Sequence, residues 1–329
     1  MGDKTTRREF LKQMAFTGVA VTGLSGVASA AEKVLKGADN GKARVVIATD
    51  RTALKGDGVI VQSVIDQMVD RSVTKLTNAA NAAQGWKSLF SPSDIVGIKV
   101  NTLFAGGTST HMEVVNSIIR GLKSAGVKED NIIIWDRSTS DLIKCGFQPN
   151  KDGKGVKCYG DDGDWGETIK QGSFNGRITK VISQKVTAFI NVPILKTHGL
   201  AGISCCLKNH YGSFDNPGKH HDNNCNPALA DFSSIPVVKN KTRLVIVDAL
   251  RPQYDGGPGS KPDVQFNNYA ILASTDPVAT DAVGLQIIQK SRVKAGLNPI
   301  AAEATAWLKS AQDRNVGICD MDRIDVLNA

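Results

Sequence analysis

Several features that would assign a chain of 329 residues to a familiar class of protein are missing from this sequence. No two cysteines have the Cys-x-x-Cys spacing, which excludes a ferredoxin-type cluster and a zinc ribbon in their usual form. The apolar run at residues 14–27 is too short, and too often interrupted by glycine and threonine, to hold a helix in a bilayer. We therefore expect no permanent membrane span. No internal repeat or low-complexity tract occurs, which excludes a repeat architecture.

A concentrated block of basic residues is also missing. The formal net charge is +8, but the lysines and arginines are spread along the chain without a long basic run. This distribution predicts no nucleic-acid partner and supports only a mild preference for anionic ligands. The hydrophobic content of 41% is that of an ordinary globular protein, so a packed core is expected.

The first thirty residues have the pattern of a twin-arginine export signal. Arg7 and Arg8 precede Phe10-Leu11-Lys12, the weakly apolar run follows, and Ala28-Ser29-Ala30 offers small residues to a signal peptidase. We expect residues 1–30 to direct export through the twin-arginine translocase and the remaining chain to be periplasmic. Because this route carries folded proteins, the signal favours a metal or redox site acquired before export.

The remaining chain alternates short apolar runs with segments of helical period. This pattern predicts a three-layer α/β fold, with a mostly parallel sheet and helices on both faces. We expect one domain over residues 31–329, with a Gly/Asp-rich insertion near 150–176. The predicted strands cover residues 44–48, 95–100, 132–135, 186–190, 243–247 and 269–273, and the predicted helices cover 59–79, 112–122, 277–288 and 300–311.

Polar side chains follow five of the predicted strands at the point where each strand ends. They are Asn101, Asp136, Asn191, Asp248 and Ser274. In open α/β sheets, ligands bind at the carboxyl ends of the strands, so we expect one shared site at this edge. The alternative explanation for these polar residues is that every strand must leave the core into a polar loop, whether or not a site is present.

Most potential metal ligands lie in one segment. Four of the five histidines lie between residues 198 and 221, and three of the six cysteines lie between 205 and 225. If residues 204–211 are helical, Cys206 and His210 are four residues apart on one face, with His220, His221 or Cys225 completing a shell. Sulfur with imidazole favours a transition metal such as zinc or iron. Alternatively, the cysteines are core residues and His220-His221 is a solvated loop.

The same segment also contains two lysines, Lys196 and Lys208. Lysines beside a glycine-rich turn and a helix start can hold a carboxylate or a phosphate. A desolvated lysine can also act as a base or form a Schiff base. His198 and Asn209 lie next to them in sequence and are expected to line the same site. The alternative to a role in the site is that both lysines are ordinary exposed surface residues.

Loops and helix starts elsewhere add further candidates. Asp248 and Asp281 are expected to supply carboxylates, with Asp281 pointing into a crevice one turn after an N-cap at Asp276. Gly256-Gly257, together with Asn101, would allow close approach of a cofactor, although a simple turn explains the glycines equally well. The sequence at 110–113 has the pattern of a capping box for the helix that follows.

Four motifs in order resemble the family catalogued as domain of unknown function 362. They are Lys-Thr-His-Gly-Leu at 196–200, Leu-Lys-Asn-His-Tyr-Gly at 207–212, Gly-Gly-Pro at 256–258 and Asp-Pro-Val-Ala-Thr-Asp at 276–281. The strand Ile98-Lys99-Val100-Asn101 fits the same family. Many members carry a ferredoxin-like extension and are iron–sulfur proteins. This chain departs from them, because it has no Cys-x-x-Cys and only Cys319 near its C-terminus.

The sequence therefore supports three hypotheses of function. The first is a metal-dependent or redox-associated periplasmic protein, which leaves open whether it is an enzyme. Its site would comprise Lys196, His198, Lys208, Asn209, Asp248 and Asp281. The second is a binding protein for an anionic small molecule, without catalysis. The third is an accessory subunit of an exported redox complex.

Overall fold

The computed structural model describes residues 41–329 apart from residue 57. The export signal predicted for residues 1–30 lies outside the described residues. Among the described residues, no helix is both long enough and apolar enough to cross a membrane.

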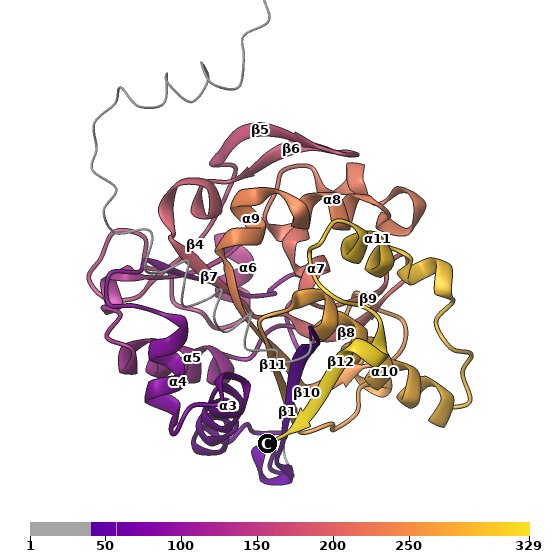
Figure 1. Ribbon diagram of the computed structural model, residues 1–329, viewed down its shortest axis with the longest axis horizontal. Helices are drawn as coiled ribbons and strands as arrows, with labels where there is room; N and C mark the ends of the chain where they lie inside the picture. Colours follow the sequence, from indigo (N-terminus) through magenta and orange to yellow (C-terminus); the bar gives the residue numbers. More distant parts are fainter. Residues whose placement is uncertain (1–40, 57) are drawn as a thin grey trace, which may run out of the picture.

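A large mixed sheet forms the centre of the described chain (Figure 1). Most neighbouring strands are parallel, while β11 runs antiparallel to both of its neighbours and β8 pairs antiparallel with β9. The strand order is β12 (Ile324–Asn328), β1 (Ala43–Thr49), β11 (Ala270–Ser274), β10 (Thr242–Gln253), β7 (Ala188–Asn191), β2 (Val96–Lys99), β3 (Ile132–Asp136) and β4 (Lys157–Gly160). The strands β8 (Ile194–His198) and β9 (Gly202–Ser204) extend the sheet beside β10.

Helices cover both faces of this sheet, which gives the three predicted layers. Successive residues of a strand point to opposite faces, so Val96 and Ile98 belong to one hydrophobic cluster and Ile133 and Trp135 to the other. On the first face lie α3 (Gln62–Thr77), α4 (Ala82–Leu89) and α5 (Met112–Ser124). On the second face lie α8 (Ala228–Ser234), α9 (Pro236–Lys241), α10 (Pro277–Lys294) and α11 (Trp307–Asp313).

The predicted elements are present, with differences at their ends. The strand predicted for residues 243–247 continues to Gln253, because it pairs with β11 on one side and with β7 and then β8 on the other. The helix predicted for 59–79 begins only at Gln62, since Ile60 forms an isolated bridge with Leu54. The segment 300–311 contains a 3-10 turn, Ala302–Thr305, before α11.

The Gly/Asp-rich segment near 150–176 contains regular structure. It supplies β4 at the edge of the main sheet and β5 (Trp165–Gln171), which pairs with β6 (Phe174–Thr179) in a separate hairpin. Phe174 anchors this hairpin, because its ring lies 5.1 Å from the rings of both Phe214 and Phe232 in edge-to-face contacts. The hairpin thus packs on the segment that follows β9.

Two short helices complete the carboxyl edge of the sheet. One is α6 (Thr139–Lys144), which begins directly after β3. The other is α7 (Cys206–Asn209), which follows β9 and continues into a 3-10 turn over His210–Gly212. Helix α6 therefore starts where the parallel strand β3 ends, which is the edge that the sequence predicts to hold the site, whereas α7 reaches this edge after β9, which runs antiparallel to β8.

Candidate functional site

A cavity of about 330 Å³ opens at the carboxyl ends of β2, β3 and β8. It is lined by residues from the loop after β2, the end of β3, strand β8 and helix α7, together with Pro217 and Pro258. The structure brings six of the predicted site residues to its wall: Asn101, Lys196, His198, Lys208, Asn209 and His221. Residues far apart in the sequence therefore meet at one edge of the sheet.

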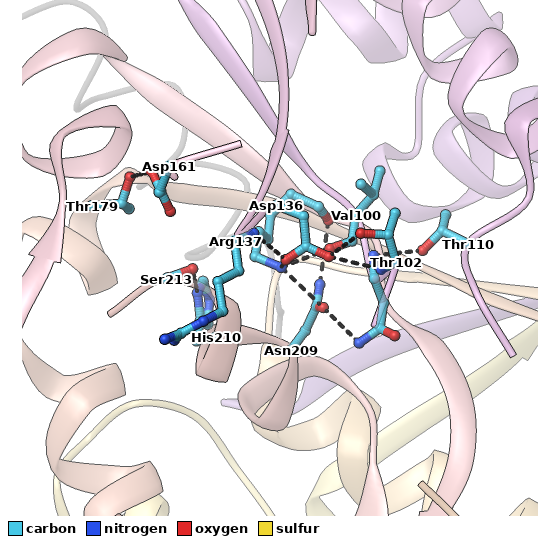
Figure 2. A network of polar contacts seen from close by, with 12 residues as sticks. Val100, Thr102, Thr110, Asp136, Arg137, Asp161, Thr179, Asn209, His210 and Ser213 are labelled. Carbon is cyan, nitrogen blue, oxygen red and sulfur yellow. Dashed lines mark hydrogen bonds and ion pairs between the residues drawn. The ribbon is translucent and has the colours of Figure 1, made fainter. Parts of the chain in front are cut away.

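The floor of the cavity rests on a buried ion pair at the ends of two neighbouring strands. Lys99 ends β2 and Asp136 ends β3, and the Lys99 Nζ lies 2.7 Å from the Asp136 Oδ1. The other carboxylate oxygen accepts hydrogen bonds from both the backbone N–H and the hydroxyl of Thr102, at 2.7 Å each (Figure 2). These contacts offset the cost of removing both charges from water.

The side-chain amide of Asn209 joins this ion pair to two further strand ends. Its Oδ1 accepts hydrogen bonds from Lys99 Nζ at 3.3 Å and from Asn101 Nδ2 at 3.2 Å (Figure 2). Its Nδ2 donates to the backbone carbonyl of Lys99 at 3.3 Å and to Asn191 Oδ1 at 2.7 Å. Asn209 therefore fixes α7 against β2 and β7.

Gly212 allows this close packing because it has no side chain. A Cβ atom at this position would lie 2.3 Å from Asp136 Oδ1 and 2.9 Å from Lys99 Nζ. Real Cβ atoms do not come so close to polar atoms, so any other residue would displace the ion pair. The Gly in Leu-Lys-Asn-His-Tyr-Gly is thus required by the floor of the cavity.

Two lysines in the cavity wall lack a carboxylate partner. Within the described chain, neither Lys196 nor Lys208 has an acidic oxygen within 4.0 Å. The Lys196 Nζ instead donates to the Thr108 carbonyl at 2.9 Å and to Asn101 Oδ1 at 3.3 Å. Burial lowers the pKa of Lys196 to about 8 and the pKa of Lys208 to about 7.

The imidazoles beside Lys208 are held in defined tautomers. His221 Nδ1 lies 2.9 Å from the Pro217 carbonyl, so this nitrogen carries the proton, and Nε2 accepts a hydrogen bond from Lys208 Nζ at 3.3 Å. His198 Nδ1 accepts from the backbone N–H groups of Leu200 and Ala201 at 3.2 Å each. Burial lowers the pKa of His198 to about 3, so both rings are neutral near pH 7.

Two predicted site carboxylates lie outside the cavity wall and hold the fold together. Asp248 accepts hydrogen bonds from His111, through the backbone N–H at 2.9 Å and the ring Nδ1 at 2.6 Å. Asp281 is fully buried and accepts from the backbone N–H groups of Cys206 and Leu207 at 2.6 and 3.0 Å. Asp281 therefore caps α7 and does not point into a crevice, which corrects the expectation from sequence.

The predicted glycine loop and capping box also have structural explanations. A Cβ atom on Gly257 would lie 1.9 Å from the Thr197 carbonyl oxygen, so Gly257 permits close contact with β8, and Gly256 has a positive φ of 66°. The capping-box prediction is wrong. The Thr110 hydroxyl donates to the Val192 carbonyl, and α5 begins after His111 without a side-chain cap.

The predicted metal ligands do not form one group. His210 is buried, with its Nδ1 3.1 Å from Ser213 Oγ (Figure 2) and its Nε2 3.4 Å from Asn191 Nδ2. His220 stacks on Phe174 with ring centroids 4.8 Å apart, and Cys225 is buried. In the described part of the chain, three ligand atoms lie within 4.8 Å of one another at Cys205, Cys206 and Asp281 instead.

Sequence reasoning missed several residues of the cavity wall, among them Arg137, Phe104, Tyr211 and Asp141. Arg137 follows Asp136 directly, and its guanidinium donates to the Phe214 carbonyl at 3.0 Å. Phe104 lies in the loop after β2, and Tyr211 follows His210 in the quoted motif. Arg137 follows an aspartate that ends a strand, and this position could have identified it as a site residue. Nothing in the local sequence identifies Phe104 as one.

A second cavity, of about 290 Å³, lies on the other side of α7. It is lined by His210, Ser233 and Asp276 among others. The Asp276 carboxylate already accepts hydrogen bonds from the backbone N–H groups of Val278, Ala279 and Ile318. Asp276 therefore caps α10, as the sequence predicts, and its carboxylate is already used by the fold.

Comparison with known proteins assigns the family. The sequence model of the family described as "Domain of unknown function (DUF362)" matches residues 96–286, and the chain belongs to this family. The matched region contains the lysines, Asn209 and the ion pair. No match was found among the curated proteins.

The solved structures that match include one of low sequence identity. It is a protein from Thermotoga maritima determined by the Northeast Structural Genomics Consortium, with a TM-score of 0.42 and 10% sequence identity. The alignment covers 72% of the present chain and 60% of the Thermotoga chain.

Proposed function

We propose that the protein binds an anionic small molecule, with a carboxylate or a similar oxyanion held between Lys196 and Lys208. The observation that carries this proposal is the pair of buried lysines without acidic partners in the wall of one cavity. A buried ammonium group without a partner is costly, and an anion would supply the missing charge. Arg137 adds a third cation to the same wall, while the two carboxylates there, Asp136 and Asp141, are paired with Lys99 and Lys144.

The pKa values of the lysines support this proposal. Burial is the main cause of both reductions, and the charge of Lys196 further lowers the pKa of Lys208. The two ammonium groups therefore act on one another within the cavity. An oxyanion bound between them would favour both charged forms and would raise both pKa values.

Sulfate affinity should fall as the pH rises through 7 and more steeply above 8. Below pH 7 both lysines of the free protein are protonated, whereas binding requires the uptake of one proton by Lys208 between pH 7 and 8 and of a second by Lys196 above pH 8. The affinity should then decrease by about tenfold for each pH unit and for each proton taken up. Isothermal titration with sulfate between pH 6 and roughly 9.5 tests this, because sulfate stays a dianion throughout that range, so any change of affinity comes from the protein. An affinity independent of pH would contradict the role of the lysines.

We also propose that residues 1–30 export the protein to the periplasm. The order of Arg7 and Arg8 before Phe10-Leu11-Lys12 supports this reading. Replacing both arginines by lysine should leave full-length precursor in the cytoplasm, as measured by fractionation and immunoblotting. Mature protein in the periplasm of the double variant would refute the proposal.

The hypothesis that the protein is an accessory subunit of an exported redox complex has its own test. A second subunit that co-purifies with the exported protein would support this role.

A second candidate function is metal binding at Cys205, Cys206 and Asp281. These residues supply two sulfurs and one carboxylate within 4.8 Å, a donor set that suits zinc or iron. The fit is incomplete, because structural zinc sites have four ligands and the carboxylate already accepts two backbone N–H groups. Burial also raises the pKa of both thiols, which disfavours the thiolates that a metal requires.

Metal content after purification decides between these two candidates. If metal binds, Cys206→Ser should lose most of it, while Cys158→Ser, which alters another buried cysteine, should retain it. Elemental analysis of protein matured through export gives the stoichiometry. Equal metal in the two variants, or no metal in the unaltered protein, would reject the Cys205/Cys206/Asp281 site.

A further inference from the structure

We infer that the anion bound in this cavity carries an aromatic group, so that the ligand class is an aryl carboxylate or a similar aryl oxyanion. This inference rests on the proposed function and extends it to the part of the ligand beyond the charged head. Four rings, those of Phe104, Tyr211, His198 and His221, line the cavity that contains the two lysines. An aliphatic anion of small size would contact fewer of these rings than an aryl anion would.

Phe104 places an apolar ring in the wall of the cavity rather than in the hydrophobic core. Its side chain is 48% exposed, and its neighbour Leu103 is 51% exposed. Its φ of 70° lies in the left-handed region, which is costly for a bulky residue. The loop leaves the sheet through Thr102, which the Asp136 carboxylate holds by two hydrogen bonds. The fold thus keeps an apolar ring at the cavity rather than in the core.

A second group of rings lies beside Lys208. The rings of Tyr211 and His221 are 4.8 Å apart in an edge-to-face contact, and His221 stacks on His198 at 5.7 Å. Hydrogen bonds at Nδ1 fix the tautomers of both imidazoles, as described above. Neutral imidazoles and a phenol present flat apolar surface that can pack against a planar ligand.

Each lysine lies close to one of these rings. The Lys196 Nζ is 5.9 Å from the centroid of Phe104, and the Lys208 Nζ is 3.2 Å from the centroid of Tyr211. An oxyanion held by the two ammonium groups would therefore lie near the ring of Phe104 beside Lys196 and near the ring of Tyr211 beside Lys208. A ligand with its charge attached directly to an aromatic ring satisfies both kinds of group at once.

Benzoate and acetate provide the probes, because they share a carboxylate and differ in the ring. Isothermal titration of the mature protein purified after export should give benzoate an affinity at least about tenfold above that of acetate. Phe104→Ala should lower benzoate affinity by about tenfold and leave acetate affinity unchanged. Val293→Ala, which truncates an exposed apolar side chain on α10, is the control and should change neither.

The outcomes separate this inference from the proposed function. If sulfate binds but benzoate binds no better than acetate, the aromatic class is wrong and the anion site stands. If benzoate binds equally well after Lys196 and Lys208 are replaced by methionine, the lysine anchor is wrong while the rings retain their role. Transferred nuclear Overhauser contacts from benzoate to Phe104 would support the inference, and their absence at saturating benzoate would overturn it.

Discussion

Replacing Lys196 and Lys208 together by methionine should abolish measurable sulfate and benzoate binding while making the protein more stable. A hydrogen bond to a charged group contributes about 1.5–3 kcal/mol, so the loss of two should lower affinity by at least ~100-fold. Stability should rise because two desolvated charges without acidic partners are removed from the fold. Calorimetric titration measures the first effect and thermal unfolding near pH 6 the second.

If the double variant loses binding but gains stability, the lysines bind the anion directly. A variant that lost binding because its fold was damaged would lose stability as well. Lys241→Met is a matched control, since burial also lowers the pKa of Lys241 although its Nζ donates to the Ile182 carbonyl outside the cavity. This variant should bind sulfate normally. Retained affinity in the double variant would remove the basis of the proposed function.

Asp136→Ala should destabilise the protein by about 3–5 kcal/mol, because it leaves the ammonium group of Lys99 buried and unpaired. It also removes the acceptor for the Thr102 N–H and hydroxyl, so the loop that carries Phe104 loses its attachment. Urea denaturation measures the free energy of unfolding. Binding of benzoate should weaken as well, even where the variant remains folded.

A surface ion pair provides the comparison. Asp313 pairs with Lys309 on the exposed side of α11, and Asp313→Ala should cost less than about 0.5 kcal/mol. Adding Lys99→Met to Asp136→Ala should restore part of the lost stability, because no uncompensated charge then remains in the core. If Asp136→Ala costs no more than Asp313→Ala, the buried ion pair is not the support of the cavity floor.

The sequence allowed the sheet and part of the cavity to be predicted for the same physical reason. Strands buried on both faces are largely apolar, so a polar residue marks where they end, as at Asp136 in β3, while β2 ends at Lys99, two residues before the predicted marker Asn101. Lys196 and Lys208 were indicated by their place in the polar segment after the central strands. Their burial and their lack of acidic partners depend on long-range packing, which the local sequence does not contain.

The cysteine and histidine prediction assumed a regular helix over residues 204–211. Instead, α7 ends at Asn209 and the chain tightens into a 3-10 turn over His210–Gly212. Residues four apart no longer share a face when the turn contains three residues rather than 3.6. His210 accordingly points to Ser213 and Asn191, while Cys206 lies beside Cys205. Tight packing at Gly212 against Asp136 accompanies this change.

The hydrogen-bonding capacity of the Asn209 amide is already used in full. An amide has two donor hydrogens and two acceptor lone pairs, and those of Asn209 are taken by Lys99, Asn101 and Asn191. A ligand therefore meets no directional amide contact at this point of the floor. In the proposed site, the oxyanion would instead be held by the charge of the two ammonium groups, which are point charges that suit tetrahedral and planar oxyanions alike. Chemical selectivity must then come from the remainder of the ligand, through the shape of the cavity.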